Sequence, residues 1–275
     1  MNKSLSILLF SIILFVGCSA TTVDKKNISS NDVQSGRNEA LAQDHFIRGA
    51  IYDLKGNYHA AIMEYQDALL LDEQAGIHNA LSKDYLMVQQ VVPALKHSKR
   101  AVELSPNDVE YNFFLGSIYK IAQRTDSAEI YFEKVIELDS LYYQAYYSLA
   151  QINEIKNPLK SLEVYNELLR LTGPEWTVLV KIAELNERMG NVDSTINTVE
   201  KLLKLNPSNL RLQKLLIESY IKTDRDEKAL ILVDDALAMF PDDLTLIEYK
   251  GNIKANQNKY IHICIYSLRR NIKII

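Results

Sequence analysis

The chain has 275 residues, which is long enough for one large core or for a long stack of small repeated units. Hydrophobic residues make up 47% and charged residues 24%, as in an ordinary folded soluble body. The formal net charge is -4, so the composition argues against a nucleic-acid-binding protein, which usually carries a strongly basic face. With only 9 Gly and 6 Pro, the chain contains few helix breakers, and this favours helices.

The first 17 residues have the layout of a secretory signal peptide. Lys3 precedes an uncharged stretch at residues 5–16 that is too short to span a bilayer as a helix. The sequence Phe15-Val16-Gly17-Cys18 then resembles the lipobox of bacterial lipoproteins. This resemblance implies that Cys18 becomes the lipidated first residue of a mature protein in the cell envelope, and we expect the outer membrane, facing the periplasm or the surface. An uncleaved signal anchor, or a plain secretory signal, is the alternative.

Residues 18–41 have the composition of a flexible tether. From Ser19 to Asn38 the segment is rich in Ser, Thr, Asn, Asp and Lys and has no apolar period. We therefore expect the folded body to begin near Ala42 and to stand off the membrane surface.

From Ala42 onward, one pattern of Gly, Ala, Tyr and Pro recurs every 33 or 34 residues. We place six full units and one partial unit at residues 42–74, 75–108, 109–142, 143–175, 176–209, 210–243 and 244–261. The pattern resembles the tetratricopeptide repeat (TPR), whose period is about 34 residues. The resemblance implies an all-α fold, a right-handed superhelical solenoid in which each unit is a pair of antiparallel helices.

The repeated positions have a physical meaning in such a hairpin. Small residues at the eighth and twentieth positions of a unit would let its two helices approach closely, while large residues fill the remaining space. The eighth positions hold Gly49, Gly116, Ala150, Ala183 and Gly251, and the twentieth hold Ala61, Ala94, Ala128 and Ala229. Pro106, Pro207 and Pro241 are expected to follow the ends of second helices, and Gly56 and Gly190 to occupy left-handed turns.

In this family the first helix of each unit lines a concave groove, and its second, fifth, ninth and twelfth positions face a partner. We expect Phe46, Phe113 and Tyr147 to anchor an extended or helical peptide, because aromatic side chains supply much contact area at little entropic cost. The alternative is that these rings are partly buried packing. The further groove candidates are Asn79, Lys83, Ser117, Gln151, Glu184, Arg211, Lys214 and Glu218.

Motifs that would carry chemistry are missing from the sequence. There is no HExxH, GxSxG, Walker loop or GxGxxG, and the 5 His and 2 Cys have no zinc-ligand spacing. We therefore expect no catalytic residue, no metal and no cofactor. Cys264 would be a lone thiol, so a disulfide framework is not expected.

After Glu248 the chain has no acidic residue, and residues 262–275 lose the repeat pattern. This basic and apolar tail is interpreted as a degenerate capping helix or as a loosely packed end, with contact to anionic lipid as a third reading.

Together these features predict a non-enzymatic scaffold of the bacterial envelope that binds a protein or peptide in its groove. A surface lipoprotein that binds carbohydrate or peptidoglycan is the alternative. The oligomeric state does not follow from the sequence.

Overall fold

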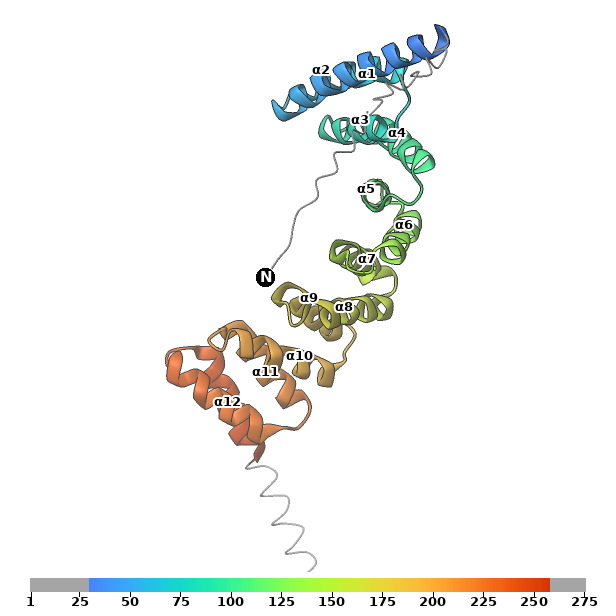
Figure 1. Cartoon of the computed structure of the whole chain (residues 1–275). Helices are drawn as coiled ribbons and strands as arrows, with labels where there is room; N and C mark the ends of the chain where they lie inside the picture. The colour runs from blue at the N-terminus through green and yellow to red at the C-terminus, as the bar shows by residue number, and fades with distance from the viewer. Residues whose placement is uncertain (1–29, 258–275) are drawn as a thin grey trace, which may run out of the picture.

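The computed structural model describes residues 30–257, and within them the chain is a solenoid of α-helices without strands (Figure 1). The signal peptide, Cys18, Cys264 and the 262–275 tail lie outside the described residues, as does the last part of the partial unit. Among the residues described, no helix combines the length and the apolar character that crossing a membrane requires.

The helices follow one another in pairs along the chain. Their bounds are α1 (Ser30–Leu54), α2 (Tyr58–Leu71), α3 (Ala75–Met87), α4 (Val91–Leu104), α5 (Val109–Ile121), α6 (Thr125–Leu138), α7 (Tyr143–Lys156), α8 (Pro158–Thr172), α9 (Trp176–Arg188), α10 (Val192–Leu205), α11 (Leu210–Lys222) and α12 (Asp226–Met239). A further helix covers residues 244–257. Each helix packs mainly on its neighbours in sequence, which is the nearest-neighbour architecture of a repeat protein.

Figure 1 shows these helices along a curved path, with α3, α5, α7 and α9 on its inner side and α4, α6 and α8 on its outer side. The first helices of units two to five therefore line the concave surface, as the family resemblance implies. The expectation of an all-α repeat solenoid is confirmed.

The N-terminal boundary differs from the sequence-based expectation. Residues 30–41, assigned to the flexible tether, are helical and form the first turns of α1. Described side chains before Ala42 are mostly exposed, whereas Ala42 itself is buried, so this extension adds almost nothing to the core. It continues α1 because helix-compatible residues such as Asn38 and Glu39 precede Ala42 without a proline.

The two helices of a unit approach each other at the small residues. Ala61, Ala94, Ala128 and Ala229 are all 0% exposed. The closest approaches are at the glycines, since a β-carbon built on Gly49 would lie 2.6 Å from Cε1 of Tyr65. On Gly116 the corresponding distance, to Cε1 of Phe132, would be 2.9 Å.

The turn between the two helices of a unit has a recurrent left-handed residue. Gly56 and Gly190 have φ of 72° and 71°, as expected, because glycine carries no side chain to strain that conformation. Gln89, Gln123 and Asp224 adopt positive φ at the same place in their own units. After second helices, Pro106, Pro207 and Pro241 each stand two residues beyond the end of α4, α10 and α12.

Buried polar side chains donate hydrogen bonds to the backbone of the turns between units. Asn112 and Gln213 each donate from the side-chain amide to a proline carbonyl six residues earlier, Pro106 at 3.0 Å and Pro207 at 2.8 Å. The hydroxyl of Tyr146 donates to the Ser140 carbonyl at 3.2 Å in the same way. The fourth position of a unit thus satisfies a backbone acceptor in the turn that precedes it.

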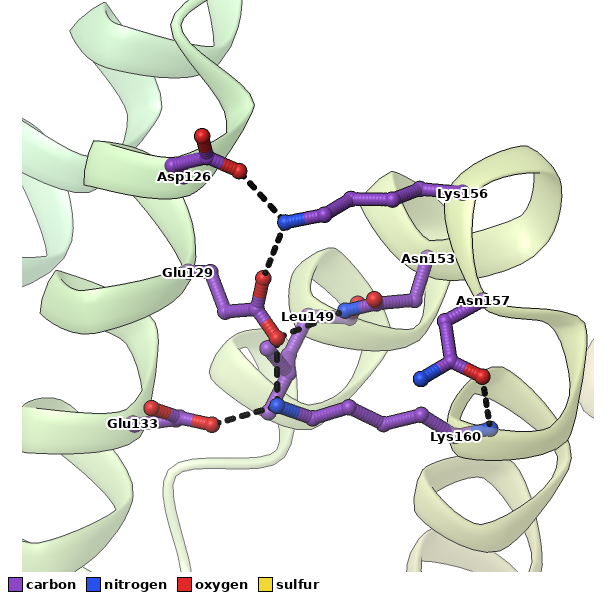
Figure 2. Close-up of polar contacts among 8 residues, drawn as sticks. All are labelled: Asp126, Glu129, Glu133, Leu149, Asn153, Lys156, Asn157 and Lys160. Carbon is purple, nitrogen blue, oxygen red and sulfur yellow. Dashed lines mark hydrogen bonds and ion pairs between the residues drawn. The ribbon is translucent and has the colours of Figure 1, made fainter.

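An ion network joins the third unit to the fourth (Figure 2). Lys156 and Lys160 reach back to α6, where Lys160 Nζ lies 2.6 Å from Glu133 Oε1 and both lysines contact Glu129. Burial opposes ionisation of Glu129, yet the hydrogen bonds from Lys160 and Lys156 hold its pKa below the ordinary value. The network fixes the angle between the two units through charges that are partly withdrawn from water.

The close approach at Gly49 gives a direct test of the packing. We expect Gly49→Ala to lower the free energy of unfolding by about 1–3 kcal/mol, because the added methyl must displace the Tyr65 ring. Gly36→Ala is the matched control in the same helix. It has no atom within 4 Å of its β-carbon and should be neutral or stabilising by up to about 1 kcal/mol. Urea denaturation of both variants measures the difference, and equal effects would contradict the packing argument.

Candidate partner-binding groove

The three aromatic residues expected in the groove lie on the first helices of units one, three and four, and each is half-buried. Each packs on a ring from the second helix of its own unit: Phe46 on Tyr65 at a centroid distance of 5.3 Å, Phe113 on Phe132 at 5.6 Å and Tyr147 on Tyr165 at 5.8 Å. Phe113 also contacts Tyr142 at 4.9 Å. These rings therefore contribute to hairpin packing and offer a partner only part of their surface.

The polar candidates in the N-terminal half of the groove are mostly engaged within the chain. The Lys83 ammonium lies 5.7 Å from the centroid of the Phe114 ring, at the distance of a cation–π contact. Ser117 donates to the Phe113 carbonyl at 2.9 Å, and exposed Gln151 accepts from Lys120. Asn79 is half-buried on α3.

The four charged candidates in the C-terminal half lie on α9 and α11. Lys214 pairs with Asp243 at 2.8 Å, and its hydrogen bond lowers the pKa of that carboxyl. Glu184 lies 3.4 Å from Lys181, and Glu218 accepts from the Tyr249 hydroxyl. Arg211 is exposed and has no ion pair with any residue in the described part of the chain.

These four residues converge on a cleft between α9 and α11. Two adjoining hollows form it, with volumes of about 240 Å³ and 470 Å³, and they share Glu187, Arg211 and Leu215. Half-buried Val180, Leu212 and Leu215 make its apolar lining, together with Trp176, which is 37% exposed. An apolar pocket rimmed by both signs of charge is suited to one side chain of a polypeptide and the backbone on either side of it.

Trp176 is the residue that the sequence analysis missed. It was treated only as the first residue of the fifth unit, and its position places it at the mouth of the cleft between α9 and α11. The available signal was that it is the only Trp in the chain and stands at the start of a groove-lining helix.

A second feature missed from the sequence is a buried acid on the first two units. Asp84 occupies a position of α3 that other units fill with buried Ile118, Leu185 or Ile253, and it is only 1% exposed. Burial, together with the charge and hydrogen bond of Asp53, raises the pKa of Asp84 to about 7. One oxygen of the Asp84 carboxyl has no hydrogen-bond partner. The seam between units one and two therefore holds a carboxyl that is half-protonated near neutral pH.

A hollow of about 720 Å³ lies beside α4, and its lining combines apolar side chains with a group of paired charges. Arg100 donates to Glu73 at 2.8 Å and to Glu103 at 3.1 Å, and Glu73 also contacts His78. Burial lowers the pKa of His97 to about 4, so its ring is neutral at pH 7. We assign this hollow no partner.

Comparison with known proteins supports the repeat assignment. The family model described as "Tetratricopeptide repeat" matches residues 45–74 and 109–140, which fall in the first and third units. The chain thus contains tetratricopeptide repeats. No curated protein sequence matches it.

Several solved structures share the fold. A structure of MamA protein is 22% identical with a TM-score of 0.56, covering 62% of this chain and 92% of that one. PilF of Pseudomonas aeruginosa is 17% identical with a TM-score of 0.51, covering 78% of this chain and 99% of that one. YrrB, titled a TPR protein with an unusual peptide-binding site, is 17% identical with a TM-score of 0.52, covering 68% and 97%. At these identities the similarity shows the fold alone.

The raised pKa of Asp84 predicts a pH-dependent loss of stability. An unfolded Asp ionises at a pKa near 3.8, whereas folded Asp84 keeps its proton up to about pH 7. The unfolded state therefore binds fewer protons between these values, so stability falls as pH rises from about 4 to about 7 and then levels. Asp84→Asn has the shape of the protonated acid and should be more stable than wild type by roughly 2–4 kcal/mol at pH 8.

The difference between wild type and Asp84→Asn should shrink toward zero at pH 4, and denaturation of both proteins across pH 4–8 measures it. Asp67→Asn, at an exposed position of α2 away from Asp53, is a control that should show no comparable pH-dependent gain. A constant difference between wild type and Asp84→Asn at all pH values would contradict the assignment.

Proposed function

We propose that the protein is a non-enzymatic interaction scaffold of the bacterial cell envelope that binds a polypeptide in its concave groove. The observation that carries the proposal is the cleft between α9 and α11, which is lined by Trp176, by half-buried aliphatic residues and by the exposed charges of Glu184, Glu187 and Arg211. TPR proteins are general protein–protein interaction scaffolds, and the solved YrrB structure is titled for a peptide-binding site.

The geometry favours a polypeptide over the carbohydrate alternative. A sugar-binding surface would need several exposed aromatic faces in line. Phe113 instead contacts rings on two sides, and the rings of Phe46 and Tyr147 each pack on a tyrosine. In the cleft, exposed Arg211 and Glu187 share a hollow with half-buried Leu215, so charged groups and an apolar surface are offered together to a bound segment.

The envelope location rests on the sequence around Cys18, which resembles a lipobox. A protein held through several acyl chains would be anchored stably, whereas one chain alone would anchor it only marginally. In this proposal the groove binds a partner close to the membrane surface, within the distance that the anchored protein can reach.

The partner site can be tested by photo-crosslinking in native membranes. A photoreactive amino acid replaces Glu184, which is exposed at the cleft rim, and in a matched variant it replaces Ile231, which is exposed on the second helix α12. We expect Glu184 to capture a defined polypeptide that Ile231 does not capture. Adding Trp176→Ala to the Glu184 variant should reduce that product several-fold, because the apolar contact is lost.

Capture of the same proteins from both positions would contradict a groove-specific partner. An undiminished product in the Trp176→Ala background would show that the cleft between α9 and α11 does not hold the captured segment. Circular dichroism of each variant establishes that the helical content is retained.

The anchor has a separate test. Cys18→Ala should move the protein from the detergent-soluble membrane fraction into the soluble fraction of lysed cells, because no thioether-linked lipid can form. Wild type and a Ser19→Ala control should stay with the membrane. Retention of the Cys18→Ala protein in the membrane would contradict lipidation as the anchor and would leave the groove proposal untouched.

A further inference from the structure

The first hairpin brings together a nitrogen ligand and two carboxylates from different helices. His45 lies on α1, and Glu64 and Asp67 lie one turn apart on α2. His45 Nδ1 is 2.8 Å from Glu64 Oε2, and one ligand atom from each of the three residues lies within 4.8 Å of the others. From this geometry we propose that His45, Glu64 and Asp67 form a binding site for a divalent transition-metal ion of the zinc class.

The donor set fits such an ion. Zn²⁺ takes imidazole nitrogen at about 2.0–2.1 Å and carboxylate oxygen at about 2.0–2.2 Å, usually with four ligands in a tetrahedron. In a tetrahedron of that size, donor atoms lie about 3.3 Å apart. The separation of 2.8 Å between His45 and Glu64 is already close to this value, and a carboxylate oxygen of exposed Asp67 lies within 4.8 Å of a ligand atom on each of these two residues. Three protein donors leave the fourth position to water.

The hairpin places these residues together through its register. The same three positions of the second unit hold His78, His97 and Arg100. There too the first two side chains meet, with His78 Nδ1 2.9 Å from His97 Nδ1. The contact therefore recurs, but in the second unit the guanidinium of Arg100 takes the place of the Asp67 carboxylate. A cation is favoured in the first unit and opposed in the second, which provides an internal control.

One neighbouring charge opposes the metal ion. Arg48 Nε lies 3.8 Å from Glu64 Oε2, but the Arg48 guanidinium also pairs with Asp44 at 2.6 Å. The carboxylates of Asp44, Glu64 and Asp67 outnumber the one guanidinium, so the net charge of the cluster is negative. Removing the Arg48 charge should strengthen the site.

Metal binding would cross-link α1 to α2. Because the ligands come from both helices, they are held at these distances only in the folded hairpin. Binding therefore stabilises the folded state in proportion to the logarithm of metal concentration above the dissociation constant. The site lies on the hairpin nearest the proposed anchor and does not include the cleft between α9 and α11, so it is independent of the proposed function.

Isothermal titration of the full chain with ZnCl₂ at neutral pH, after treatment with a chelator, tests the site. We expect wild type to bind one ion, and Asp67→Asn and His45→Ala to weaken binding on the order of tenfold or more. Asp67 is exposed, so its variant should fold normally. His78→Ala is the control in the second unit and should leave the affinity unchanged, whereas Arg48→Gln should raise it.

A thermal melt supplies the second readout. Zn²⁺ should raise the melting temperature of wild type and of Arg48→Gln but not of Asp67→Asn, while Mg²⁺, which prefers all-oxygen ligands, should have little effect on any of them. Binding that survives Asp67→Asn and His45→Ala unchanged, or wild-type binding no tighter than that of Asp67→Asn, would overturn the proposal.

Discussion

The close approach of two helices at a small residue is the constraint on which this solenoid depends. Gly49 and Gly116 leave room for the rings of Tyr65 and Phe132, and the same rings also pack against Phe46 and Phe113, one turn earlier on the same first helices. The spacing of each hairpin thus sets how far an aromatic side chain of the first helix can extend into the groove. The same aromatic side chains pack the hairpin and face the groove. The shape of the groove surface therefore depends on how closely the two helices of each hairpin pack.

Much of the fold could be predicted from the sequence because the same pattern of small, large and turn residues recurs in successive units. The helices α3, α5, α7, α9 and α11 begin at Ala75, Val109, Tyr143, Trp176 and Leu210, the residues at which the repeat pattern placed unit starts. The small residues and left-handed turns followed the same register. The N-terminal extension of α1 was not predicted, because Ser30 to Leu41 lie before the first repeat and the side chains described there, from residue 34 on, are almost all exposed.

The candidate sites were less predictable, because they depend on what differs between units. Asp84 is an acid where most other units have an aliphatic residue, and its pKa depends on Asp53 from the preceding unit. Likewise His45 meets Glu64 and Asp67 only through the register of α1 on α2, which no local spacing displays. The repeat pattern identifies the residues that the units share. The candidate binding sites and the titrating acid instead lie at positions where one unit differs from the others, and they depend on contacts between helices.

Asp84 also has a mechanical consequence. The units contact only their neighbours, so they carry a load in series, like links of a chain, and the weakest joint yields first. Above neutral pH the seam between the first and second units is weakened, because buried Asp84 becomes charged close to Asp53. A pull applied between α1 and α9 would pass through this seam. Ionisation of Asp84 therefore makes the first hairpin easier to separate from the rest of the solenoid.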